Sequence, residues 1–190
     1  MPPEIFPIIE KDFTAYQRFL KRKKKTHSDS IILDQQHQHH RVCCGDVGVV
    51  GGKPVGECLL NGRVSIDDRT VFSFRLFAKF FGEGPCFRFC SSGRAHTNRR
   101  QGEGLPDRTF TTPHFHHVDR HGIMRAFHNK TLADPKASAK IAKNFKLGID
   151  LFCQELKVVS PNGGSVVVKL LPLEVDLSTD DPLRGEQFQL

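Results

Sequence analysis

The chain lacks sequence features that mark several common protein classes. Its six cysteines form no C-x-x-C pair. Cys86 and Cys90 stand four apart on an expected strand, about 13 Å from each other, so one zinc ion could hold both only if the strand bent. We therefore expect reduced and mostly buried thiols. The glycine-rich segment 45–56 contains no G-x-x-x-x-G-K-S/T motif, which argues against a nucleotide-binding loop there.

Long apolar runs and a secretory leader are missing as well. No stretch approaches the roughly 18 consecutive apolar residues that a membrane-spanning helix needs. The first residues, MPPEIFPIIEKDF, have neither the basic start nor the apolar middle of a signal peptide. These absences predict a cytoplasmic protein that does not span a membrane.

Positive charge is what the chain has in excess. Its 190 residues carry a formal net charge of +7, which favours an acidic partner such as RNA or another acidic polymer. Six of the basic residues form one run, namely Arg18, Lys21, Arg22, Lys23, Lys24 and Lys25. Solvated helix ends also have this composition, so the run alone does not establish nucleic-acid binding.

Alternating apolar residues predict an aromatic hairpin in the middle of the chain. Between residues 71 and 81 one side of the expected strand carries Phe72, Phe74, Leu76, Ala78 and Phe80. Residues 82–85 form a turn, and residues 86–91 run back. Closing this turn aligns Phe87 and Phe89 with the apolar side and places Arg88 with Arg75 and Lys79. One face is therefore expected to be a phenylalanine core and the other a basic surface.

Helices are expected on both sides of this hairpin. Helical spacing predicts a helix over residues 10–25, and Asp134-Pro135 is a typical start for a second helix over 134–157. Further strands are expected at 31–33, 109–118, 123–129 and 166–175. The fold class is α+β, with an antiparallel sheet of four to six strands packed against the helix 134–157. We expect a basic helical N-terminal extension at 1–28, a single α+β domain at 29–177 and a flexible acidic tail at 178–190.

Four of the ten histidines fall within residues 114–121, on an expected strand that ends in a turn at 119–122. Strand alternation and pairing through this turn place His114 and His116 beside Arg125 on the more open face. His117 then points toward the core, and His121 lies in the turn. A shift of one residue in the register would exchange the partners of both His114 and His116.

Three kinds of chemistry fit this histidine strand. A pair of imidazoles could act as base and acid in metal-free RNA cleavage while an arginine neutralises the transition state. Alternatively, His-x-His places two rings on one face about 6.6 Å apart at Cα, close enough to share a metal ion with Asp119, His96 or His121. Burial of both rings with bonds to the backbone would favour a purely structural cluster. A second cluster, His37, His39 and His40, falls in a segment that the sequence pattern does not place; most such runs are solvated loops, and the cluster is left out of the site.

The chain resembles small bacterial proteins of prophages and mobile elements, including the TumE-type toxins of toxin–antitoxin modules. The resemblance is carried by His96-Thr97-Asn98, by the later Pro113-His114-Phe115-His116 and by the helix that follows, and it covers about 58–156. It implies an RNA-directed toxin with a protein antitoxin.

The leading interpretation is RNA binding, and whether it extends to cleavage, as in a ribonuclease, stays open. His114 and His116 would be the acid–base pair, Arg125 would hold phosphate, and His96 would support them; no cofactor or metal is expected. The nucleic-acid contacts would be Arg22, Lys23, Lys24, Lys25, Arg75, Lys79, Arg88, Arg99 and Arg100. The alternatives are a non-catalytic mobile-element protein that inhibits a host or defence factor, and a metal-dependent hydrolase.

Overall fold

The computed structural model describes residues 5–33, 35–37, 39–50, 58–98 and 108–170. In chain order the elements are α1 (Pro7–Lys11), α2 (Phe13–Lys21), β1 (Lys24–Thr26), β2 (Ser30–Leu33), β3 (Gln35–His37), β4 (His40–Val49), β5 (Cys58–Ser65), β6 (Phe72–Ala78), the 3-10 helix η1 (Lys79–Phe81), β7 (Pro85–Cys90), β8 (His96–Asn98), β9 (Arg108–Phe110), β10 (His114–Val118), β11 (Met124–Phe127), α3 (Pro135–Ala142), α4 (Phe145–Leu156), β12 (Val158–Val159) and β13 (Val167–Leu170).

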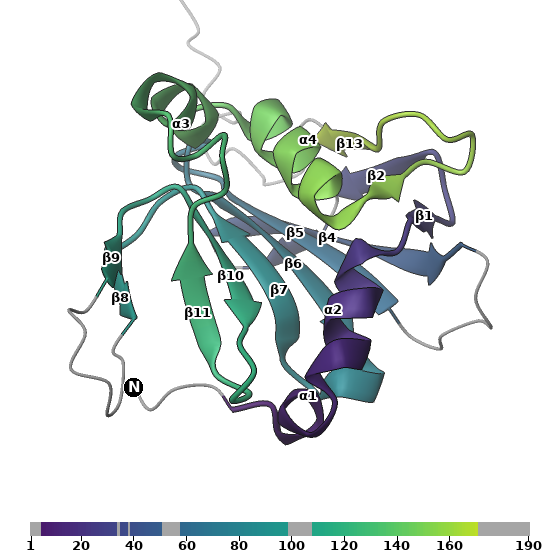
Figure 1. The fold of residues 1–190 in the computed structure, drawn as a ribbon. Coiled ribbons are helices and arrows are strands. Elements are labelled where there is room, and N and C mark those ends of the chain that lie inside the picture. The colour runs from purple at the N-terminus through teal and green to yellow at the C-terminus, as the bar shows by residue number, and fades with distance from the viewer. Residues whose placement is uncertain (1–4, 34, 38, 51–57, 99–107, 171–190) are drawn as a thin grey trace, which may run out of the picture.

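A large mixed sheet dominates the described part of the chain (Figure 1). Its nine strands follow the order β11-β10-β7-β6-β5-β4-β1-β12, with β3 also paired to β4. The pair β1–β12 is parallel, and the other pairs of this sheet are antiparallel. The α+β class is confirmed, but the expected four to six strands were too few. Strands β1, β3 and β4 account for much of the difference, because their sequences alternate too weakly to have been expected as strands.

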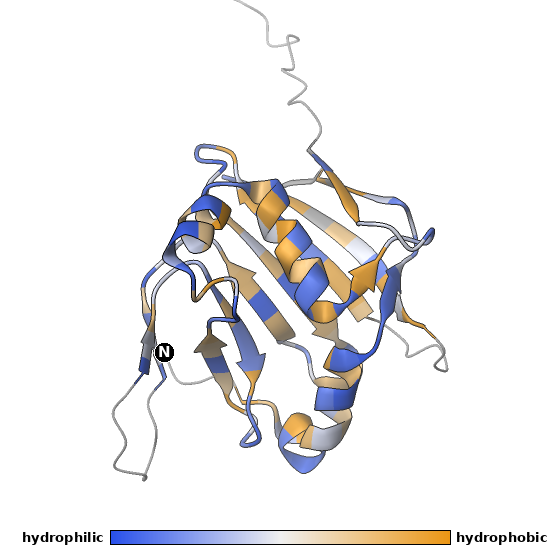
Figure 2. Ribbon diagram, turned by 45° about the horizontal axis from the view of Figure 1, so that its top comes forward, coloured by the Kyte–Doolittle hydropathy of each residue, from blue (hydrophilic) through white to orange (hydrophobic). Residues whose placement is uncertain are grey.

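The aromatic hairpin forms as the alternation predicts. Phe74 lies opposite Phe89 and Leu76 opposite Phe87, and Arg75 lies opposite Arg88 on the other face. Helix α4 crosses the phenylalanine face (Figures 1 and 2), where the Phe152 ring lies 5.7 Å from that of Phe74 and 5.9 Å from that of Phe87. The core is therefore between this face and α4.

Two of the expected elements are each divided in the structure. The helix expected over 134–157 is two helices, because the Asn144 side chain accepts a hydrogen bond from the Leu147 amide and starts α4 anew. The strand expected over 109–118 is interrupted before Pro113, which has no amide hydrogen to donate to a ladder. Its first part, β9, pairs with β8 in a separate small sheet. Strand β8 lies in a segment that was expected to be a loop. The last strand, β13, pairs with β2 in parallel.

The N-terminal helices pack into the same core as the sheet. Tyr16 and Phe19 of α2 are buried, and the Tyr16 hydroxyl donates a hydrogen bond to the Cys86 carbonyl. The expected helix over 10–25 ends at Lys21, and Lys24 begins strand β1. The segment is thus part of the folded body, and its basic run divides between a helix end and a strand. No helix in the described ranges is long and apolar enough to cross a membrane.

Candidate functional site

The register of β10 differs by one residue from the expected register. His116 lies opposite Ala126 on β11, and His117 lies opposite Arg125. Arg125 therefore shares the helix-covered face with His117, and its Nε donates to the Asp119 carboxylate at 2.8 Å. The expected grouping of His114 and His116 with Arg125 was wrong, because a longer turn shifts the return strand by one position and so exchanges its faces.

The other neighbour of β10 supplies the partners of the two histidines. On β7, Cys90 lies opposite His114 and Arg88 lies opposite His116. These four side chains share the sheet face opposite α4, since the intervening Phe89 and Phe115 belong to the core face. The arginine beside the histidine pair is thus Arg88, which the sequence had assigned to a basic surface.

Both histidines are buried rather than open, with 3% of His114 and 1% of His116 exposed. Nδ1 of His114 lies 3.2 Å from the Thr111 carbonyl, the backbone bond expected of a structural histidine. His116 instead contacts Arg88 through both ring nitrogens, at 3.3 and 3.4 Å. The partner of this ring is therefore an arginine side chain and not a backbone carbonyl.

Burial also decides the protonation of the pair. Burial, with a smaller contribution from the neighbouring Arg88, lowers the pKa of His114 to about 4 and that of His116 to about 2. Both imidazoles are then neutral at pH 7. A general acid must hold a proton at the working pH, so these shifts oppose the expected acid–base pair and leave two neutral nitrogen donors.

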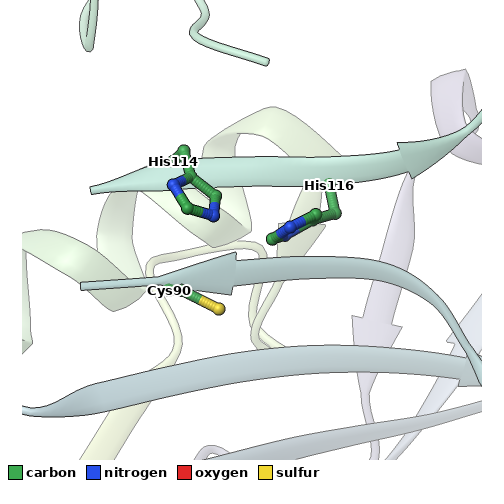
Figure 3. A group of neighbouring side chains, drawn as sticks. All are labelled: Cys90, His114 and His116. Carbon is green, nitrogen blue, oxygen red and sulfur yellow. The ribbon is translucent and has the colours of Figure 1, made fainter. Parts of the chain in front are cut away.

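Cys90 completes a cluster that the sequence did not predict. One donor atom from each of Cys90, His114 and His116 lies within 4.8 Å of the other two, and Figure 3 shows Cys90 on the strand next to the one that carries the two rings. Burial raises the pKa of the Cys90 thiol, while Arg88 and Arg75 act in the opposite direction. Only the pairing of β7 with β10 brings the thiol here, and no sequence spacing encodes that pairing.

His96 reaches the same cluster from β8, as the sequence had suggested. Its ring centroid lies 5.0 Å from that of His116 and 6.2 Å from that of His114. The neighbouring Asn98 fixes the hairpin to the edge of β11, because its amide donates to the Ala126 carbonyl at 2.7 Å and accepts from the Ala126 amide at 3.0 Å. The Asn98 side chain thus makes with the Ala126 backbone the same pair of hydrogen bonds that a neighbouring strand would make.

A row of basic side chains continues from the cluster across the sheet. Arg88 on β7 lies opposite Arg75 on β6, which lies opposite Asn61 on β5. Arg63, on the same face of β5, places its Nη2 2.9 Å from Nδ1 of His40. We call the sheet face that carries Arg63, Arg75 and Arg88 the arginine face.

The other expected nucleic-acid contacts are scattered. Lys79 is exposed in η1, and Arg22 and Lys23 are exposed after α2. Lys24 is fully buried, so its expected contact with nucleic acid was wrong. Lys25 donates to the Pro161 carbonyl at 3.2 Å. Arg99 and Arg100 lie outside the described residues.

Of the second histidine cluster, the structure describes two side chains, those of His39 and His40. His39 is exposed and lies 3.6 Å from the Asp67 carboxylate, at the turn between β3 and β4. His40 begins β4, where it contacts the arginine face through Arg63. The segment that the sequence did not place is therefore a turn and the start of a strand, with His39 in solvent.

Known proteins give no further guide to this site. Comparisons with models of protein families, with curated proteins and with solved structures find no match for the chain. The resemblance to TumE-type toxins stays a prediction, and the function must be argued from the residues themselves.

Proposed function

We propose that the protein binds RNA through the arginine face, with the phosphate backbone as the contacted group. The observation that carries the proposal is the direct cross-strand pairing of Arg75 with Arg88. Neighbouring strands are about 4.8 Å apart, and like charges directly opposite each other destabilise a sheet. An anion placed between the two guanidinium groups turns this repulsion into attraction.

RNA fits this arrangement better than a single small anion. Arg63 lies one strand further along the same face, and His40 extends the row at that end. A row that crosses several strands offers repeated contacts to a chain of phosphates, and arginine forks suit phosphate oxygens. The net charge of +7 favours the same class of partner.

The proposal covers binding and assigns no proton transfer to His114 or His116. Both rings are almost fully buried, and burial lowers the pKa of each far below neutral pH. A 2′-hydroxyl would have to reach a ring that solvent does not reach. We therefore place RNA along the arginines rather than on the histidine pair.

The test is the salt dependence of RNA affinity. Fluorescence anisotropy with a labelled single-stranded RNA gives the dissociation constant at several salt concentrations. Each phosphate contact to a single strand contributes about −0.7 to the slope of log K against log salt. The double variant Arg75→Gln/Arg88→Gln should bind more weakly and lose about 1.4 from the slope.

A control separates this face from net charge alone. Arg94 and Arg120 are exposed in turns, so Arg94→Gln/Arg120→Gln removes the same two charges elsewhere. Equal weakening by the two double variants would reduce the proposal to nonspecific charge and contradict it. The same holds if the wild-type protein binds no RNA at low salt. Circular dichroism of each variant confirms that the fold is kept.

A further inference from the structure

We propose that Cys90, His114 and His116 form a site for a transition-metal ion, with zinc as the ion that their chemistry suits best. The inference is independent of RNA binding, because it uses different atoms. Its basis is the donor geometry: one sulfur and two ring nitrogens lie within 4.8 Å of one another at a place that solvent hardly reaches.

The donor atoms are close to the separation that a metal needs. With Zn–S bonds of about 2.3 Å and Zn–N bonds of about 2.0–2.1 Å, tetrahedral donors stand roughly 3.4–3.6 Å apart. A contraction of about 1 Å therefore closes the cluster, which small side-chain rotations supply. The backbone need not move, since Cys90 and His114 are a cross-strand pair and His114 and His116 share one face of β10.

The hydrogen bond of His114 leaves one of its ring nitrogens available to a metal ion. Nδ1 of His114 lies beside the Thr111 carbonyl, which can only accept, so the proton sits on Nδ1 and Nε2 presents its lone pair. Ligating histidines usually have such a partner on the second nitrogen. Arg88 lies within hydrogen-bond distance of both ring nitrogens of His116, at 3.3 and 3.4 Å, so an ion bound to this ring takes the place of one of these two contacts.

His96 lies where it can complete the shell. Its ring is a neighbour of both His114 and His116, and it is carried by the β8–β9 hairpin that Asn98 attaches to β11. One thiolate and three imidazoles would make a closed four-ligand site. Thiolate and imidazole donors favour zinc over the oxygen-seeking Mg²⁺ and Ca²⁺.

Metal loading of the purified full chain tests the proposal. Protein stripped with EDTA and desalted is given Zn²⁺ or Co²⁺, desalted again and analysed by elemental mass spectrometry. We expect one ion per chain, and for Co²⁺ a sulfur-to-metal charge-transfer band with the intense visible bands of tetrahedral coordination. Cys90→Ser should lose the charge-transfer band.

Matched controls come from the same sheet and the same hairpin. Cys44 is an exposed free cysteine of β4, and His121 is exposed in the turn after β10, so Cys44→Ser and His121→Asn should load as the wild type does. His96→Asn should weaken Zn²⁺ binding at least about tenfold. An unchanged affinity in His96→Asn removes His96 from the site.

A measurement on the wild-type protein guards against variants that fail to fold. Zn²⁺ should protect Cys90 from alkylation by iodoacetamide, mapped by peptide mass spectrometry, while Cys44 is alkylated at the same rate with and without the ion. Failure of the wild type to retain an ion overturns the proposal. So does an ion that is retained without protecting Cys90.

Discussion

Lys24 places a positive charge in the core, where its Nζ donates to four main-chain carbonyls, those of Phe19, Leu20, Arg22 and Leu156. These carbonyls belong to the ends of α2 and α4, which carry the negative ends of the helix dipoles. One ammonium group therefore caps two helices at once, and it also lies 4.6 Å from the centre of the Phe19 ring.

Replacement of Lys24 by a neutral side chain should lower the stability of the protein. Lys24→Met keeps the length of the side chain but removes the ammonium donor from four carbonyls, of which that of Phe19 still accepts from the Arg22 amide, and we expect a loss of about 3 kcal/mol in the free energy of unfolding at pH 7. Denaturant titration measures the loss. Lys23→Met, one position away in solvent, is the control and should change stability by less than about 0.5 kcal/mol; equal losses would show that Lys24 is no cap.

The same residue should make stability depend on pH in the alkaline range. Burial lowers the pKa of Lys24 from 10.5 to about 8 in the folded protein. Between these two values the unfolded chain binds more protons than the folded one, so the contribution of Lys24 to stability rises with pH. The stability of the wild type relative to Lys24→Met should therefore increase from pH 8 to pH 10.5. A constant difference over that window would contradict the shifted pKa.

At the residue scale, the sequence identified the face of the aromatic hairpin but not the partners of its histidines. Strand alternation correctly separated Arg75 and Arg88 from the phenylalanines. It could not decide the register of β10 against β11, because a turn that is one residue longer or shorter exchanges every face. Cys90 could not be predicted as a neighbour of His114, since that pairing joins two separate hairpins.

Helix α4 lies so close to the sheet that one position admits only glycine. A Cβ atom on Gly148 would stand 2.3 Å from Cε2 of Phe72, a distance that forces the ring or the helix to move. The close approach lets Phe145 and Phe152 pack on the phenylalanine face. Nothing in the spacing of residues 134–157 indicates which of its small residues meets the sheet.

Gly148→Ala should therefore destabilise the protein, although alanine is the better helix former. Overpacking of this kind costs about 1–3 kcal/mol, against a gain of up to about 1 kcal/mol from helix propensity. Gly164, where the nearest atom to a new Cβ is 3.7 Å away, offers the comparison: Gly164→Ala should leave the unfolding midpoint nearly unchanged. A more stable Gly148→Ala protein would mean that α4 is not held this close.

The β8–β9 hairpin depends on Asn98 for its place beside β11. Asn98→Ala removes both bonds to Ala126, so the Ala126 amide should exchange its hydrogen faster by about one order of magnitude or more, since a lost hydrogen bond is worth about 1 kcal/mol or more. Hydrogen exchange read by NMR measures this. Thr97→Ala, which removes a bond within the hairpin itself, should leave that amide protected; loss of protection in both would point to the hairpin rather than to Asn98.

At the scale of the whole molecule, the α+β class followed from composition and alternation, whereas the size of the sheet did not. The strands with a strong pattern, β6 and β7, were expected at nearly their observed bounds. The strand β4 reads HRVCCGDVGV, whose glycines and paired cysteines hide the alternation. Its place is fixed by long-range pairing with β5 and β1, which no local pattern records.

A bound metal ion should stabilise the entire fold, because its three proposed ligands join two neighbouring strands, β7 and β10, from separate hairpins. An ion that binds only the folded state adds about 2.7 kcal/mol at a free concentration one hundred times its dissociation constant. Zn²⁺ should raise the thermal midpoint of the wild type, measured by circular dichroism, and leave that of Cys90→Ser unchanged. A Zn²⁺ effect of equal size in both proteins would place the ion elsewhere.

The parallel pair β1–β12 has a consequence for the order in which the chain can fold during synthesis. Lys24 pairs with Val158, and its ammonium group binds the carbonyl of Leu156. Strand β1 leaves the ribosome early, but it can complete these contacts only after α4 and β12 have been synthesised. Until then β1 has β4 on one side and an open edge on the other. Lys24 can then bond the carbonyls at the end of α2 but not the carbonyl of Leu156. A nascent chain arrested before residue 156 should therefore leave the start of β1 accessible, and protection of the bond after Lys24 from trypsin should appear only once α4 has emerged.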